Sequence, residues 1–470
     1  MAIDKINATA LLDGGVDSDD IASGAVDLGH LSATGTKNNT TFLRGDNSFQ
    51  VVAVTPTAVS DQANTSTGAF DIPSGTTAQR PGSPSSGYIR MNTTSGSLEF
   101  YDGSTWIATN LIPTVDSVSG TIINSIASNL TLSLSNATDS ISVIFKEGST
   151  TLATVANQTV SSGSVTVAVP SGVYGQTAGD TISISVQNID GTPSSNSQNS
   201  TVLAAPSGGT ISSSGSYRIH TFTSSGTFTN TLALSNVEYL VIAGGGGGAS
   251  RHAGGGGAGG YRSSVVGQAS GGSSSAESRQ SISAGSYSVT VGAGGGAGSG
   301  SSGVGAKGSN SVFNGITSLG GGGGHNDNDT QQYMDGGSGG GASYDAQGGD
   351  GTAGQGHDGG DGYNNSPHPG AGGGGSSQVG GNGSSSGGGN GGQGTASNIT
   401  GSSVTRAGGG GGSGHNNSAA GTGYHGGGNG SSNGNGSNAT ANTGGGGGGG
   451  ADSNTGGTGG SGIVIIRYTI

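Results

Sequence analysis

The side chains best suited to acid–base or metal chemistry here are the eight histidines, because the chain contains no cysteine. A histidine imidazole can bind Zn²⁺ or transfer a proton near neutral pH. No two histidines form an HxH or HExxH pair, and no Ser/His/Asp or paired-carboxylate arrangement can be assembled from the spacing. We therefore expect no metal site and no enzymatic activity. Six histidines lie in the second half of the chain, namely His252, His325, His357, His368, His415 and His425.

Glycine-rich motifs for nucleotides and calcium also match this chain poorly. Several GxGxxG sequences occur, but none opens a helix after a strand with an acidic residue about 20 residues further on. No GxxxxGK(S/T) loop is present. Residues 359–364 approach one repeat of a calcium-binding β-roll, yet a roll needs tandem copies with an apolar residue in each. We expect neither ligand, and no cofactor.

The histidines stand beside Asn, Asp and Tyr in short polar inserts between runs of glycine. Loops that carry Tyr, His and Asn on a rigid scaffold are typical of recognition surfaces. We predict that the inserts form an exposed tip that recognises a target; the alternative is polar loops without a target. The candidate contact residues are His325, Asn326, Tyr333, Tyr344, His357, Tyr363, His368, His415, Tyr424 and His425.

The scaffold that would position these inserts is made of glycine. Of the 107 glycines, 23 precede residue 244, and the other 84 make up about 37 per cent of residues 244–470. This approaches the collagen level, but the G-X-Y period is missing and several blocks are pure glycine. Such blocks form either a disordered linker or packed helices of the polyproline II type. The pure blocks span residues 244–248, 320–324, 408–412 and 444–450.

Apolar strands bracket the glycine region and favour the folded alternative. Residues 217–228 and 237–243 precede it, 287–291 and 311–317 lie within its first third, and 462–470 end the chain. Pairing of 237–243 with 462–470 would bring the two ends together and turn the glycine stretch into a set of loops. Glycine loses more freedom on ordering than any other residue, so many buried backbone hydrogen bonds must offset that cost.

The first 206 residues predict smaller units rich in β-structure. Residues 1–50 form an attachment or shaft segment, followed by a linker at 51–75. A small β module spans 76–110, with a hairpin turn at Asp102-Gly103 before Trp106. Residues 111–206 alternate at period two, with turns every 8–15 residues, which indicates an Ig-like β-sandwich. The fold is therefore mostly β, and its C-terminal glycine-rich domain at 208–470 combines strands with polyproline II-type glycine helices.

Composition excludes several classes of partner. The chain has 13 basic and 26 acidic residues, so its net charge of −13 opposes nucleic-acid binding. No run of about 18 apolar residues exists, and the N-terminus lacks the apolar core of a signal peptide. We expect a soluble protein without an export signal of its own.

Three segments resemble parts of bacteriophage tail fibres. The sequence around TFLRGDNSF at 41–49 is similar to elements that recur in these fibres, and 77–106 resembles a small β module of virion proteins. The most specific likeness is the glycine-rich domain of phage fibres and adhesins, which opens here with VEYLVIAGGGGG and closes with GGSGIVIIRY. In the polyglycine-sandwich tip adhesins of T-even-like phages, such end loops contact the host receptor.

The resemblance implies a tail fibre or fibre-tip adhesin that binds a bacterial surface polysaccharide or outer-membrane protein. The N-terminal region would dock on tail or baseplate proteins of the virion, after assembly in the host cytoplasm. A homotrimer is expected if residues 1–50 form a shaft, since their sparse apolar residues need partners. The first alternative is a structural virion protein, such as a head fibre, decoration or tail component, without a receptor. A more distant one is a bacterial surface adhesin.

Overall fold

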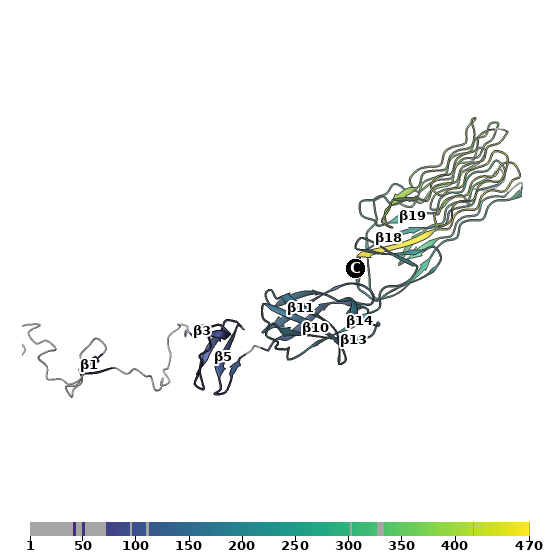
Figure 1. Ribbon diagram of the computed structural model, residues 1–470. Coiled ribbons are helices and arrows are strands. Elements are labelled where there is room, and N and C mark those ends of the chain that lie inside the picture. The colour runs from purple at the N-terminus through teal and green to yellow at the C-terminus, as the bar shows by residue number, and fades with distance from the viewer. Residues whose placement is uncertain are drawn as a thin grey trace, which may run out of the picture. The chain divides into compact units, whose positions relative to one another are not determined.

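The computed structural model describes residues 41–43, 49–51, 72–94, 96–109, 112–300, 303–326, 333–416 and 418–469 (Figure 1). Its secondary structure is nearly all β, as predicted. The chain divides after Pro73 into two units. In the first unit, β1 (Thr41–Leu43) pairs antiparallel with β2 (Phe49–Val51). The shaft predicted at 1–50 and the linker at 51–75 otherwise fall mostly outside the described residues.

A small four-stranded sheet forms the start of the second unit. Its strands lie in the order β3-β4-β5-β6, and a short 3₁₀ helix follows β3. The hairpin predicted at Asp102-Gly103 is present: Tyr101 pairs with Trp106, and the Asp102 carboxylate accepts from two backbone amides of the turn. The elements are β3 (Ser74–Gly75), η1 (Thr77–Gln79), β4 (Ile89–Asn92), β5 (Ser97–Tyr101) and β6 (Trp106–Ala108).

Two sheets enclose a hydrophobic core between residues 114 and 203, as expected for the sandwich. One sheet has the order β11-β10-β13-β14-β8 and the other β12-β9-β7. Alternation puts Leu130, Leu132 and Leu134 of β9 into the core between them. The elements are β7 (Thr114–Gly120), β8 (Ile122–Ile123), β9 (Asn129–Ser135), β10 (Ser140–Glu147), β11 (Thr150–Thr159), β12 (Ser164–Ala168), α1 (Ser171–Tyr174), β13 (Thr181–Asn188) and β14 (Gln198–Leu203).

The glycine-rich region begins and ends in one sheet. Strands β18 and β26 pair antiparallel, with Leu240 opposite Ile465, so the predicted closure of the two ends is confirmed. Both strands are buried on two faces, because one apolar cluster contains Phe228 and Val241 and another contains Ile242 and Tyr261. This sheet has the order β15-β16-β26-β18-β19, with β20 also on β18; a second has the order β17-β21-β22-β23, and β24 pairs with β25.

The bounds of these strands are β15 (Thr210–Ser214), β16 (Tyr217–Phe222), β17 (Gly226–Asn230), β18 (Leu234–Ile242), β19 (Tyr261–Ser263), β20 (Gln280–Ile282), β21 (Gly285–Thr290), β22 (Ser311–Phe313), β23 (Ile316–Ser318), β24 (Thr395–Ser397), β25 (Val404–Arg406) and β26 (Ile463–Thr469). Within the described residues, no helix is both long and apolar enough to cross a membrane.

Between these strands the chain runs away from the sheets and back in extended stretches, here called glycine segments (Figure 1). Their hydrogen bonds repeat every three residues. The amides of residues 244–249 donate in turn to the segments 303–309, 455–462 and 253–260, and then to the same three in the same order, at 2.8–3.1 Å. Three residues per turn is the repeat of a polyproline II-type helix. The glycine region is therefore a folded array.

Close packing of the segments explains why some blocks contain only glycine. A Cβ on any of residues 244–248 would come within 3.0 Å of a backbone carbonyl oxygen in a further neighbour, one of the segments 292–299, 319–325 and 444–450. Six neighbours thus surround this segment, and no position has room for a side chain. All four pure-glycine blocks are buried along their whole length. At the edge segment 292–299, in contrast, every third residue is exposed.

Candidate binding site at the outer ends of the glycine segments

Each glycine segment has one end beside the sheets and one end away from them. The chain leaves β18 through residues 244–249, turns at 250–252 and returns antiparallel through 253–260 to β19. The later segments repeat this course, so successive turns alternate between the two ends (Figure 1). We call the turns away from the sheets the outer loops. Those that matter below lie at 250–252, 344–346, 363–369, 415–416 and 451–454.

Five side chains from five different outer loops meet in one group, which we call the outer cluster: His252, Tyr344, His368, His415 and Asp452. The rings of His252 and His415 have centroids 4.1 Å apart. His252 also stacks on Tyr344 at 5.1 Å, and Tyr344 stacks on His368 at 4.8 Å. The lattice of glycine segments holds these loops, and thereby brings together residues up to 200 positions apart.

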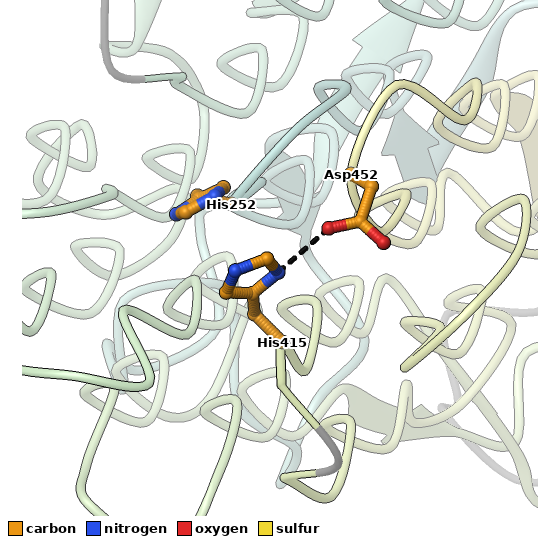
Figure 2. Close-up of side chains that lie close together, drawn as sticks. All are labelled: His252, His415 and Asp452. Carbon is orange, nitrogen blue, oxygen red and sulfur yellow. Dashed lines mark ion pairs between the residues drawn. The ribbon is translucent and has the colours of Figure 1, made fainter.

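Polarity and exposure change across the outer cluster. His252 is 8% exposed, whereas the side chains of His415 and Asp452 are 18% and 58% exposed. Nδ1 of His415 lies 2.7 Å from Oδ1 of Asp452, an ion pair when the imidazole is protonated. Figure 2 shows the His415 ring between His252 and Asp452. Nδ1 of His368 is buried without a hydrogen-bond partner among the described residues. The cluster thus runs from a buried imidazole to a solvent-facing carboxylate.

The backbone of the outer cluster carries strain that glycine would avoid. His252, Tyr344, His368 and Asp452 all have left-handed φ angles, between 47° and 55°. Left-handed backbone at a non-glycine residue costs on the order of 1–3 kcal/mol and is common at functional sites. In a region that is about 37 per cent glycine, these positions nevertheless bear large side chains. Their mutual contacts offset part of the cost, which marks the cluster as a place where side-chain identity matters.

Other sequence-predicted contact residues lie near the outer cluster without joining it. His325 and Asn326 are buried at the outer end of a glycine segment, and Nδ1 of His325 lies 3.3 Å from Oγ of Ser343. Tyr363 is half-buried in its outer loop. Tyr333 is 49% exposed, and its carbonyl accepts from an amide part-way along a glycine segment. Of these four, only Tyr333 and Tyr363 are accessible to a large ligand.

Three predicted contact residues lie at the opposite ends of the segments, which corrects the expectation of one tip. Nε2 of His357 lies 3.0 Å from Oγ of Ser273, in a turn on the sheet side. Nδ1 of His425 accepts from the amide of the residue before β24, and Tyr424 neighbours His425. The physical reason is that antiparallel segments place alternate turns at opposite ends. Polar inserts therefore occur at both ends.

Two members of the outer cluster were absent from the sequence-based candidates. His252 belongs to the insert Ser250-Arg251-His252 between two glycine blocks, the same kind of signal that identified the other inserts. Asp452 is a single acid after the block 444–450, and no local pattern distinguishes it. Its role depends on a contact with His415 that only the folded lattice creates.

Some ionic groups of this region belong to the sheets. Glu238 and Arg467 form a buried pair across β18 and β26, with Nε of Arg467 2.8 Å from the carboxylate and its guanidinium over the ring of Tyr217. Burial and the nearby Glu277 carboxylate raise the pKa of Tyr239. Glu238, Tyr239 and Arg467 are buried in the sheet and offer no open face to a ligand.

The C-terminal half of the chain matches a known family. Residues 221–469, more than half of the chain, match the family described as "Glycine-rich domain". The chain belongs to this family. The match begins within β16 and ends with β26, so the glycine-rich domain comprises the paired strands, the glycine segments and the outer cluster. No curated protein and no solved structure matches the chain.

Proposed function

We propose that this chain is a phage tail fibre or fibre-tip adhesin that binds a bacterial surface receptor through the outer loops of its glycine-rich domain. The observation that carries the proposal is the outer cluster, where aromatic, imidazole and carboxylate side chains from five loops converge at one end of a close-packed scaffold. The other end of the segments lies against the sheets, so the outer loops together form the end surface of this domain that a receptor would contact.

The chemistry of the outer cluster favours a sugar as the receptor. The partly exposed side chains of Tyr344 and His368 would supply ring contacts to a pyranose, and His415 and Asp452 would offer hydrogen-bonding groups to its hydroxyls. Among the predicted receptors we therefore favour a surface polysaccharide over an outer-membrane protein. Binding, with no catalytic step, is the expected activity.

The remaining parts of the proposal concern the N-terminal region. Residues 1–50 would dock on tail or baseplate proteins, and the small sheet and the sandwich would serve as spacers. A homotrimer follows if that segment forms a shaft.

Adsorption tests this proposal with a matched set of variants. Labelled full-length protein is added to a panel of intact bacterial strains, and bound protein is measured by flow cytometry. We expect Tyr344→Ala to lower binding to the susceptible strains roughly tenfold or more, as loss of an aromatic contact hot spot does. His425→Ala, at the sheet-side end, should bind as the unsubstituted chain does.

Treating the cells identifies the receptor class. Periodate, which cleaves vicinal diols, should abolish binding to a polysaccharide, whereas protease treatment should leave it intact; the reverse result would indicate an outer-membrane protein. Binding that survives Tyr344→Ala and His368→Ala together would refute the assignment to the outer cluster. A protein that binds no strain and fails to block infection would support the alternative of a structural virion protein.

A further inference from the structure

We propose that His252, His415 and Asp452 form a site for one divalent transition-metal ion, for which Zn²⁺ is the probe. Each residue offers one donor atom, and the three donor atoms lie within 4.8 Å of one another. They come from three separate outer loops (Figure 2). This inference does not depend on the proposed receptor binding.

The donor set determines which ions fit. Two imidazole nitrogens and one carboxylate oxygen suit Zn²⁺ and its first-row neighbours, whereas Ca²⁺ and Mg²⁺ favour sites built from oxygen alone. Bonds of about 2.0–2.2 Å place two donors of a tetrahedral ion roughly 3.3 Å apart. The donor atoms lie within 4.8 Å of one another, so small side-chain rotations would bring them to this spacing. Asp452, whose side chain is 58% exposed, has the freedom to make that movement.

The His415–Asp452 contact would change when the ion binds. Their 2.7 Å separation is shorter than the spacing of two donors on one metal. Binding of the ion would therefore widen this contact. Because Zn²⁺ carries two positive charges and Asp452 one negative charge, the occupied site has a net positive charge in an otherwise acidic chain.

The surroundings already orient the most buried ligand. The ring of His252 packs against His415 at 4.1 Å and Tyr344 at 5.1 Å, and His368 lies 5.9 Å away. Three protein ligands leave the fourth position of a tetrahedral ion open to water or to an oxygen of a bound molecule. Bound metal would also join the first outer loop of the array to the last one, and thereby reduce the opening of both.

Calorimetry on the full-length, chelator-treated protein tests the site. Titration with ZnCl₂ should give one ion per chain, and titration with CaCl₂ should give no saturable binding. His415→Ala and Asp452→Asn should each weaken Zn²⁺ binding roughly tenfold or more, because each removes one of three ligands. His425→Ala, which removes a histidine at the sheet-side end, should leave the affinity unchanged.

Two further measurements keep the outcome clear. With Co²⁺ in place of Zn²⁺, ligand-field absorption should appear in the unsubstituted chain and disappear in His252→Ala. Hydrogen exchange should show slower opening of residues 451–454 when Zn²⁺ is present. In every variant the amides of the glycine segments should stay protected from exchange, which would show that the variant is folded. Absence of saturable Zn²⁺ binding, or binding that His415→Ala and Asp452→Asn leave unchanged, would overturn the proposal and reduce the contact to an ion pair. No receptor is used, so this failure is separate from failure of adsorption.

Discussion

The packing of the glycine segments predicts opposite effects for two neighbouring Gly→Ala substitutions. A Cβ on Gly247 would overlap the backbone of Gly296 and Ala297 in the adjacent segment. A Cβ on Gly296 would meet no heavy atom within 4 Å, and its φ lies outside the left-handed range. The two residues lie in contacting segments, but a Cβ at Gly247 would point into its neighbour, whereas a Cβ at Gly296 would point into open space.

The cost of Gly247→Ala follows from the bonds that hold segment 292–299. Backbone atoms cannot rotate away as a side chain does, so the segment must shift. Three of the hydrogen bonds that hold this stretch then weaken, those from the amides of Gly295, Gly298 and Ala306. At about 1 kcal/mol each, with about 1–3 kcal/mol for overpacking and a gain of about 0.4–1 kcal/mol from a stiffer unfolded chain, the loss is about 3–6 kcal/mol. Gly296→Ala keeps only the gain, roughly 0.4–1 kcal/mol.

Scanning calorimetry and native-state hydrogen exchange on the full-length chain measure both effects. We expect Gly247→Ala to lower the unfolding temperature of the glycine-rich domain and to speed exchange in residues 244–249, while Gly296→Ala leaves both unchanged or slightly improved. The transition of the sandwich serves as an internal reference in the same sample. Equal destabilisation by the two substitutions, or none from either, would refute the close-packed arrangement.

Two buried groups in the sheets give further predictions. Burial lowers the pKa of His220, whose ring lies between a backbone carbonyl and the hydroxyl of Tyr468, so the folded state favours the neutral ring. The stability that the neutral His220 ring contributes to the folded state is complete above the unfolded pKa of about 6.5 and is lost as the pH falls below that value. His220→Gln should therefore flatten this part of a plot of unfolding temperature against pH. Arg467→Met should cost about 3–5 kcal/mol in denaturant unfolding because it leaves the carboxylate of Glu238 buried and unpaired, and adding Glu238→Gln should restore most of the loss. If Arg467→Met alone were as stable as the unsubstituted chain, the prediction for the Glu238–Arg467 pair would be wrong.

The strand pairing could be predicted from sequence because its signals are local. Alternation at period two placed strands in the sandwich, and Asp102-Gly103 predicted its hairpin. The apolar runs at 237–243 and 462–470 lacked alternation, as expected of strands buried on both faces. The pure-glycine blocks likewise indicated where no Cβ fits. Each of these inferences needs only the residues of one short segment, or of two that pair.

Composition could not predict which turns lie at the same end of the array, because this depends on how many times the chain crosses the array. Each crossing reverses direction, so two inserts of the same composition lie at opposite ends when an odd number of segments separates them. His415 and His425 are ten residues apart in sequence, yet one belongs to the outer cluster and the other lies beside β24. Only the hydrogen-bonded order of the segments decides between these positions.

The same topology explains why no ligand motif in the sequence points to the proposed metal site. Motifs such as HxH assume that two ligands lie on one strand or helix, where a fixed repeat aims both side chains at the same point. Here each outer loop contributes a single side chain, so His252, His415 and Asp452 share no spacing in sequence. A lattice of glycine segments replaces the helix or strand as the element that brings the donors together. Sites in such an array are therefore found by tracing which turns share an end.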